Sequence, residues 1–211
     1  MMVMPSNNCK AIVHEWAKRW PGSVGHLYSP DGWRGPFPHM PYALDNGAFP
    51  CWTNGKEWDE HGFWAMCFKV IDSGKQRPLW VVVPDVVADK AATLRRWDEF
   101  APEIQKTFGF PLAFAAQDGM TPSDVPESAD VVFIGGSDEF KWDAIIPFCD
   151  AFPRVHVGRV GSLRRLRQCA AAGVESCDST GWFREPRRQK QLEIFLLEQA
   201  GEEVEKQGRL F

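Results

Sequence analysis

The sequence lacks the features that mark membrane, exported and zinc-binding proteins. No apolar run approaches the about 20 residues that a membrane-spanning helix requires. The first residues, Met1 to Pro5, have neither the charged start nor the long apolar core of a signal peptide, so we expect a cytoplasmic protein with no membrane partner. None of the six cysteines lies in a Cys-x-x-Cys pair or has a histidine at zinc-ligand spacing. We therefore expect reduced, mostly buried thiols.

The sequence also lacks the two common phosphate-binding loops. No Gly-x-Gly-x-x-Gly follows the first expected strand, and no glycine-rich loop ends in Gly-Lys-Ser or Gly-Lys-Thr. These absences argue against an open, nucleotide-binding sheet.

The composition is that of an ordinary globular protein. Of the 211 residues, 44% are hydrophobic and 25% are charged, which suits one domain with a full core. We expect a single domain over residues 1–211, with an N-terminal helix, strand and loop in 1–40, a barrel that carries the motifs in 41–182, and a C-terminal helix in 183–211. The ten tryptophans and fifteen phenylalanines should mostly form the core, although some could stack on a flat ring such as a nucleobase.

The charges are distributed unevenly along the chain. The net charge of −4 argues against a protein coated for nucleic acid. Residues 159–190, however, hold eight basic and three acidic residues, so this segment carries +5 and the remainder −9. The segment is either a phosphate-binding surface or a solvated helix face, and the sequence leaves both open.

Apolar, strand-like runs alternate with helical patterns, which is typical of βα units and a parallel sheet. The expected strands are 24–28, 42–45, 79–85, 111–117, 130–136, 155–161 and 175–180. The expected helices are 9–20, 55–71, 88–108, 138–151, 163–172 and 186–207. This order predicts an α/β fold of the (β/α)8 barrel type, in which seven strands can be counted and an eighth is left open.

Polar side chains and glycines gather where the expected strands end. In a parallel barrel these ends form the active site. The tips carry Asp45, Asp85, Gln117, the pair Gly135-Gly136, Gly158 and Asp178. Such a set suits a polar, uncharged ligand rich in hydrogen-bonding groups, although three carboxylates could instead hold Mg²⁺. Asp45 or Asn46 could also do no more than bond its own backbone in an Asx-turn, which Gly47 would allow to be sharp.

The tips resemble the motifs of the tRNA-guanine transglycosylase superfamily. The run Asp45-Asn46-Gly47-Ala48-Phe49 resembles its Asp-Ser-Gly-Gly-aromatic motif, and Asp85 looks like its base-reading aspartate. The run Ala116-Gln117-Asp118-Gly119 is similar to its Val-Gln-Gly-Gly, and Ile134-Gly135-Gly136 is similar to its Gly-Gly-Leu segment.

Two further segments continue the resemblance in the same order. Val157-Gly158-Arg159-Val160-Gly161 resembles the family's Met-Gly-Val-Gly, and residues 173–179 resemble the segment that carries its nucleophile. The resemblance covers about residues 40–182. It implies a TIM-like barrel that exchanges one base for another in a nucleic acid.

The sequence departs from the family in one respect. Bacterial members that act on tRNA continue into a subdomain that holds zinc with three cysteines and a histidine, whereas no Cys or His follows Asp178 here. We therefore expect no zinc, no other cofactor, and a reduced barrel. Such proteins resemble the short DNA-guanine transglycosylases of phages and genomic islands (the DpdA type), which insert a 7-deazaguanine such as 7-cyano-7-deazaguanine. A phage-encoded protein would act in the host cytoplasm.

The resemblance assigns a role to each tip. Asp178 would be the nucleophile that attacks C1′ of the sugar, and Asp45 the general acid and base. The guanine-like edge would be bound by Asp85, Gln117 and the Gly135-Gly136 pair, with Asn46 and Gly158 beside it. Phe49 and Val157 would sandwich the flat base.

Further residues near the strand tips are assigned to phosphate binding or to structural roles. Phosphates would be bound by Arg159, Arg184, Arg187 and Arg188. His156 is interpreted as a packed strand residue, Asp118 as a turn residue and Asp89 as a helix N-cap. Asp178 could instead cap a turn through Ser179 and Thr180, and the two slot residues could be ordinary barrel filling.

Four functions remain open at this stage. The preferred one is base exchange in DNA, and the nearest alternative is the same exchange in tRNA. The third is a hydrolytic glycosylase or deazapurine-salvage enzyme. The fourth is a nucleic-acid-binding subunit without activity, against which the retained Asp45 and Asp178 argue. The sequence leaves the oligomeric state open, a homodimer included.

Overall fold

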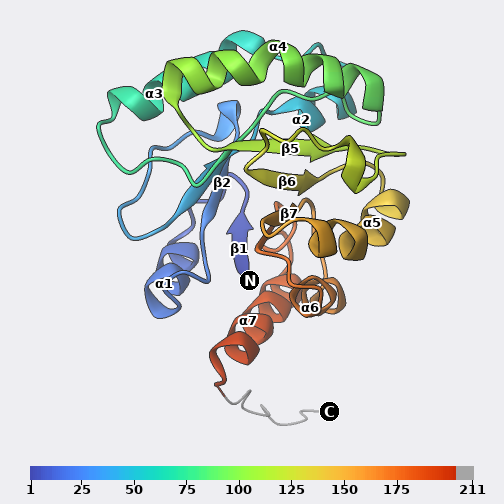
Figure 1. Ribbon diagram of the computed structural model, residues 1–211. Helices are drawn as coiled ribbons and strands as arrows, with labels where there is room; N and C mark the ends of the chain where they lie inside the picture. Colours follow the sequence, from blue (N-terminus) through green and yellow to red (C-terminus); the bar gives the residue numbers. More distant parts are fainter. Residues whose placement is uncertain (203–211) are drawn as a thin grey trace.

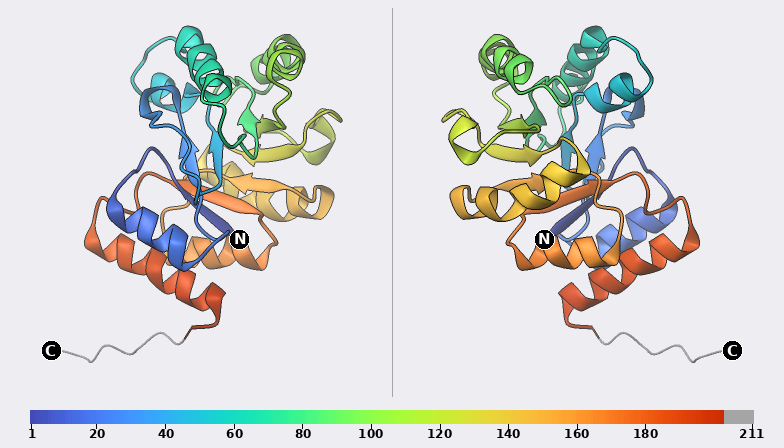
Figure 2. Two further views of the ribbon diagram at one scale, coloured as in Figure 1. Left: turned by 90° about the vertical axis from the view of Figure 1, so that its left-hand side faces the viewer. Right: turned by 90° about the vertical axis from the view of Figure 1, so that its right-hand side faces the viewer.

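The computed structural model describes residues 1–202, and within them eight strands form one all-parallel sheet in the order β1-β8-β7-β6-β5-β4-β3-β2 (Figure 1). The two end strands meet through parallel bridges that join Val3 to Val24 and Ser6 to Leu27. These bridges bring the sheet round into a barrel, with the helices on its outside (Figure 2). The predicted (β/α)8-type fold is confirmed.

The strands are short, as expected for a small barrel. They are β1 (Met2–Pro5), β2 (His26–Tyr28), β3 (Tyr42–Leu44), β4 (Val81–Val82), β5 (Leu112–Ala116), β6 (Val131–Ile134), β7 (Val155–Val157) and β8 (Ser176–Ser179). Seven of them fall inside the predicted runs, which extended further at one or both ends.

Six of the seven helices within residues 1–202 follow the predicted order, whereas the short helix Ala48–Thr53 was not predicted. The helices are α1 (Ala11–Arg19), α2 (Ala48–Thr53), α3 (Glu60–Asp72), α4 (Lys90–Phe108), α5 (Asp138–Ala151), α6 (Leu163–Ala171) and α7 (Pro186–Ala200), with 3-10 turns η1 (Pro30–Gly32) and η2 (Pro122–Asp124). The predicted end of the last helix, 203–207, lies outside the described residues. No helix within residues 1–202 is long and apolar enough to cross a membrane.

The eighth strand is β1, which is not among the seven strands expected from the sequence. Its four residues pair in parallel register with β8, from Met2 opposite Ser176 to Pro5 opposite Ser179. Four residues are too few to show a period, so nothing local distinguishes this strand. Its pairing depends on β8, which lies more than 170 positions further along the chain.

The side chains of each strand alternate between the barrel interior and the helix layer. The interior cluster is Met4, Leu27, Ala43, Trp80, Val82, Ala113, Ala115 and Val131. The strand neighbours of these residues join the larger cluster under the helices. Small alanines on β3 and β5 make room for the indole of Trp80, which therefore fills the barrel below the carboxyl ends of the strands.

Several helix N-termini show the expected capping chemistry. Asp89 caps α4 by accepting from the Ala92 N–H at 2.9 Å, as predicted, and Ser162 caps α6 through the Arg165 N–H. Ser137 caps α5 in the same way. Asn7 and Asn8 precede α1 but do not cap it, because its N-cap position is Lys10.

Gly136, at the tip of β6, has both a left-handed backbone and close neighbours. Its φ is +65°, and a Cβ there would lie 2.6 Å from Asp118 Oδ2 and 2.8 Å from the Phe140 ring. We expect Gly136→Ala to lower the free energy of unfolding by about 2 kcal/mol or more, because strain and a clash add. Urea denaturation measures this loss.

Gly55→Ala is the matched control for that substitution. Gly55 has a φ of +62° and no atom within 4 Å of a Cβ, so only the backbone strain remains. We expect it to cost about 1 kcal/mol. Equal losses in the two variants would show that crowding at Gly136 has no energetic effect.

Candidate active site

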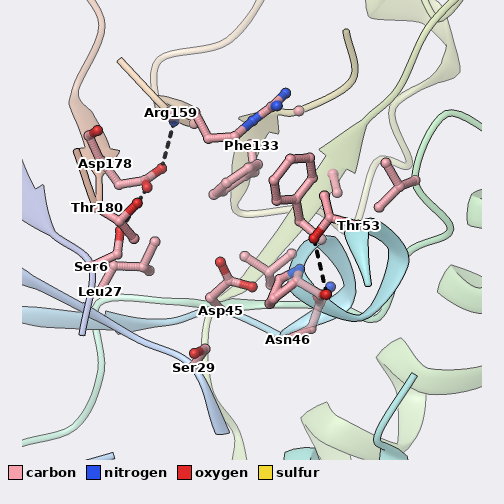
Figure 3. A pocket seen from close by; sticks show the side chains of 18 of the residues that line it. Ser6, Leu27, Ser29, Asp45, Asn46, Thr53, Phe133, Arg159, Asp178 and Thr180 are labelled. Atoms are coloured by element: carbon pink, nitrogen blue, oxygen red, sulfur yellow. Dashed lines mark hydrogen bonds between the residues drawn. The ribbon is translucent and has the colours of Figure 1, made fainter. Parts of the chain in front are cut away.

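A cavity of about 550 Å³ opens at the carboxyl ends of the strands. This volume lies within the range usual for small-molecule sites, about 300–1,000 Å³. Residues in or after each of the eight strands line it, so the whole ring contributes. Figure 3 shows Asp178 and Asp45 pointing into this space from different sides.

Asp178 lies on the inner face of β8 and accepts three hydrogen bonds. Its Oδ2 accepts from the Ser6 hydroxyl at 2.8 Å, and its Oδ1 accepts from the Arg159 N–H at 3.2 Å. His156 Nε2 lies 3.2 Å from the same Oδ1. The carboxyl is nearly buried, at 6% exposure, and faces the cavity. Asp178 therefore does not cap a turn.

The turn after β8 is held by other groups. Ser179 Oγ accepts from the Gly181 N–H at 3.0 Å, and Thr180 Oγ1 accepts from Arg184 at 3.3 Å. The turn thus satisfies its own donors without using the Asp178 carboxyl, which remains directed at the cavity.

Asp45 follows β3, two strands away from β1 in the ring, and also lines the cavity. Its Oδ1 accepts from the Gly47 N–H at 2.8 Å, so the Asx-turn of the alternative interpretation forms, while the carboxyl still faces the cavity. Gly47 has the left-handed φ of +78° that the turn requires. Burial raises the pKa of Asp45 to about 7, with smaller contributions from the charges of Asp178 and Asp85, although the Gly47 N–H favours the ionised form.

Asp85 follows β4 and is held between two carboxamides. Its Oδ1 accepts from Asn46 Nδ2 at 2.7 Å, and its Oδ2 accepts from Gln117 Nε2 at 2.8 Å. Burial raises the pKa of Asp85 to about 6, against the Asn46 bond and the charge of Arg96. The carboxyl is thus fixed in orientation and, with a pKa of about 6, mostly ionised at pH 7.

The two carboxamides have different remaining capacity. Asn46 donates to both Asp85 and the Val83 carbonyl and accepts from the Ala48 N–H, so both of its N–H groups are used. Gln117 accepts from the Ala88 N–H and donates once to Asp85, which leaves one amide N–H. Asn46 therefore positions Asp85, whereas Gln117 can also donate to a ligand.

Aromatic rings line the cavity, but only one of the two residues predicted to enclose a flat base, Phe49, does so. Phe49 on α2 lines it as predicted, and the guanidinium of Arg159 lies 4.3 Å from the centre of that ring. Val157 does not line the cavity. Its side chain is fully buried in the cluster under the helices, so the prediction that it faces a base is wrong. The second aromatic ring is Phe133 of β6.

Strand alternation explains the error at Val157. On β7, His156 lies on the inner face and its neighbours Val155 and Val157 face the helices. Gly158 returns to the inner face, where a Cβ would lie 3.0 Å from the Phe133 ring and 3.5 Å from Asp178 Oδ1. Gly158 thus leaves space for Phe133 beside Asp178.

The glycines at the strand tips lie as predicted. Gly135, Gly136 and Gly158 all line the cavity. Within residues 1–202 the Gly136 N–H has no hydrogen-bond partner, so it is available to a carbonyl oxygen. Asp118 stabilises the turn after Gly136 by accepting from the Ser137 N–H at 2.8 Å, which is the turn role expected of it.

Three of the four predicted arginines line the cavity. Arg184 and Arg188 lie at its edge, while Arg187 is exposed on α7 and does not reach it. Arg159 is already engaged, since it donates to the Gly136 carbonyl and covers Phe49. Its backbone is left-handed, with φ of +59°, which is uncommon for a side chain of this size.

Sequence reasoning missed three residues of the site, namely Ser6, Phe133 and His156. Ser6 follows the unrecognised strand β1, and its bond to Asp178 spans 172 positions of the chain. His156 was interpreted as packing only, but it contacts Asp178. Its place as the single polar residue in Val155-His156-Val157 was the one available signal that this position faces inward.

The arrangement can perform acid–base and nucleophilic chemistry on a flat polar ligand. It offers Asp45 as a half-buried acid of raised pKa and Asp178 as a hydrogen-bonded carboxyl in a different part of the lining. Asp85, between two carboxamides, can bind the edge of a base. In the described residues no three His, Cys, Asp or Glu side chains come close enough to hold one metal ion, so the three carboxylates do not form a shared magnesium site. No protein-family model and no curated protein matches the chain.

Proposed function

We propose that the protein is a guanine transglycosylase that exchanges guanine in DNA for a 7-deazaguanine through a covalent sugar ester on Asp178. The observation that carries the proposal is the placement of Asp178 and Asp45 at different positions around one cavity, with Asp85 fixed between Asn46 and Gln117. Exchange replaces one glycosidic bond by another, so it requires no energy source and no redox cofactor.

In the first half-reaction an oxygen of Asp178 attacks C1′ of the target nucleotide. The bond between C1′ and N9 of guanine breaks, and its electron pair passes into the leaving base. Asp45 delivers the proton that neutralises this base, and its raised pKa leaves it largely protonated up to about pH 7. The proton donor and the nucleophile can then act together at neutral pH.

In the second half-reaction the flow of electrons reverses. The incoming 7-deazaguanine loses a proton to the Asp45 carboxylate, and its nitrogen forms a bond to C1′. The bond between C1′ and Asp178 breaks, and its electron pair restores the carboxylate. The cycle returns Asp45 to its protonated form.

The edge of a guanine-like base has matching hydrogen-bond partners after the neighbouring strands β4, β5 and β6. Asp85 can accept from the ring N–H and exocyclic amine of a guanine-like edge, while the remaining Gln117 N–H and the Gly136 N–H can donate to its carbonyl oxygen. Phe49 and Phe133 both line the cavity and offer flat surfaces for an extruded base. Arg184 and Arg188 at the edge suit the flanking phosphates.

The test is incorporation of labelled guanine into duplex DNA, single-stranded DNA and tRNA, without added metal or ATP. We expect label in DNA, and intact-mass measurement should detect a protein–DNA ester during turnover. Label in tRNA alone would move the substrate to RNA. Release of free guanine without incorporation would indicate hydrolysis, and no label with any polymer, deazaguanine included, would overturn the proposal.

A further inference from the structure

His156 connects two residues of β8 through its two ring nitrogens. Its Nδ1 lies 2.8 Å from Ser176 Oγ, and its Nε2 lies 3.2 Å from Asp178 Oδ1. The connection follows from register, because His156 pairs with Ser176 across the parallel strands and Asp178 lies two residues further on the same face. All three residues are at most 6% exposed.

The ring of His156 is fixed in place by its neighbours. It stacks on Phe133 with ring centres 4.7 Å apart and an interplanar angle of 25°, and it meets Trp80 edge-on at 4.9 Å. A buried polar ring held between two aromatic side chains has little freedom to turn away from Asp178. The contact is therefore a built part of the site.

The partners determine which nitrogen carries the proton. An ionised Asp178 can only accept, so the neutral ring must present Nε2–H to it. Nδ1 then has a lone pair, which the Ser176 hydroxyl can fill as a donor. Asp178 thus selects the tautomer in which His156 donates to it, and the Ser176 hydroxyl satisfies the other ring nitrogen.

The two oxygens of Asp178 are consequently unequal. Oδ1 accepts from both His156 and the Arg159 N–H, whereas Oδ2 accepts, among the residues that the structure describes, only from the Ser6 hydroxyl. On the basis of the proposed function, the geometry points to Oδ2 as the oxygen that attacks C1′, and to His156 as a positioning residue that stabilises Asp178 as it leaves the sugar.

The effect of His156 should fall mainly on the second half-reaction. After attack, Oδ2 is bonded to C1′ and Oδ1 becomes the carbonyl oxygen of the ester. When the incoming base attacks C1′, the bond between C1′ and Oδ2 breaks, and the negative charge spreads onto Oδ1. The N–H groups of His156 and Arg159 already face Oδ1 and can stabilise this negative charge by hydrogen bonding. Without His156 the ester should persist.

The test uses His156→Phe, which retains a ring between Phe133 and Trp80 but removes the donor, and Ser176→Ala in the same background to avoid an unpaired hydroxyl. We expect kcat for exchange to fall about 10–100-fold and the fraction of enzyme trapped as the DNA ester to rise about tenfold, with KM falling in parallel. His156→Gln, which keeps an N–H donor, should recover part of kcat.

The outcomes separate this inference from the proposed function. If the wild type exchanges bases but the His156 variant loses ester and exchange activity equally, the role given to His156 is overturned and the proposed function stands. Wild-type protein that forms neither ester nor product on any polymer would overturn both. A measurement without substrate adds a second test: ¹⁵N shifts of the imidazole should show the Nε2–H tautomer in wild type, and a wild-type ring protonated only on Nδ1 would contradict the inference.

Discussion

Asp178→Asn is expected to reduce base exchange by about 10⁴-fold or more, the order of loss usual when a covalent nucleophile is removed. The amide oxygen of Asn is a poor nucleophile, so no sugar ester should form. The substitution is nearly isosteric, and the variant should keep its fold. The Asn oxygen can still accept from His156 and the Arg159 N–H, and its amide can donate to the Ser6 hydroxyl.

The measurement is incorporation of labelled guanine together with intact mass of the enzyme after reaction with DNA. Asp72→Asn is a matched control, since it removes the same charge from an exposed position at the end of α3. It should leave exchange unchanged. Ester formation by Asp178→Asn at the wild-type rate would exclude Asp178 as the nucleophile, whatever the total activity.

The barrel could be predicted because its strongest signals are local. Continuous apolar runs such as Leu79 to Val83 indicate strands buried on both faces, and each is followed by a helical pattern. The strand β1 could not be predicted, because four residues carry no period and its partner β8 lies at the other end of the chain. Its identification supplies both the eighth strand and the position of Ser6.

The site was predictable where a strand ends and not where a side chain must be assigned to a face. Asp45 and Gln117 directly follow their strands, Asp85 lies three residues after β4, and Asp178 lies near the end of β8. All four line the cavity. Val157 lies within a strand, where a one-residue shift exchanges the two faces of the sheet. Both faces of β7 are buried, so hydrophobicity does not show which residues face the cavity. The structure places His156, rather than Val157, on the inner face.

Phe133 was missed for a related reason. The run Val131 to Ile134 is apolar throughout, so it indicates a buried strand without indicating which residues face the interior. Gly158 on the neighbouring strand provides the space for the ring, but that relation appears only when β6 and β7 are paired. Contacts between strands, rather than patterns within one, determine the aromatic lining of this cavity.

Asp45→Asn is expected to reduce exchange by about 10²–10⁴-fold, the range usual for loss of a general acid and base. In wild type, formation of the sugar ester requires protonated Asp45, so its single-turnover rate should fall about tenfold per pH unit above pH 7, where the raised pKa of about 7 places the loss of the proton. The variant has no carboxyl at this position and should lack that decline. An unchanged decline in the variant would assign the acid to another group.

The leaving base provides a stricter test of the same role. DNA that carries 7-methylguanine has a positively charged base, which departs as a neutral molecule and needs no added proton. Asp45→Asn should therefore form the ester from this DNA at nearly the wild-type rate, whereas Asp178→Asn should form none from either substrate.

The Asp45→Asn variant should also remain folded. Asn can keep the bond from the Gly47 N–H, so the turn should persist. Because the folded state raises the pKa of Asp45, ionisation destabilises the wild type increasingly between about pH 4 and 7, and at pH 8 the variant should be at least as stable. A variant that is stable but not rescued by 7-methylguanine would show that Asp45 serves some purpose other than protonating the leaving base.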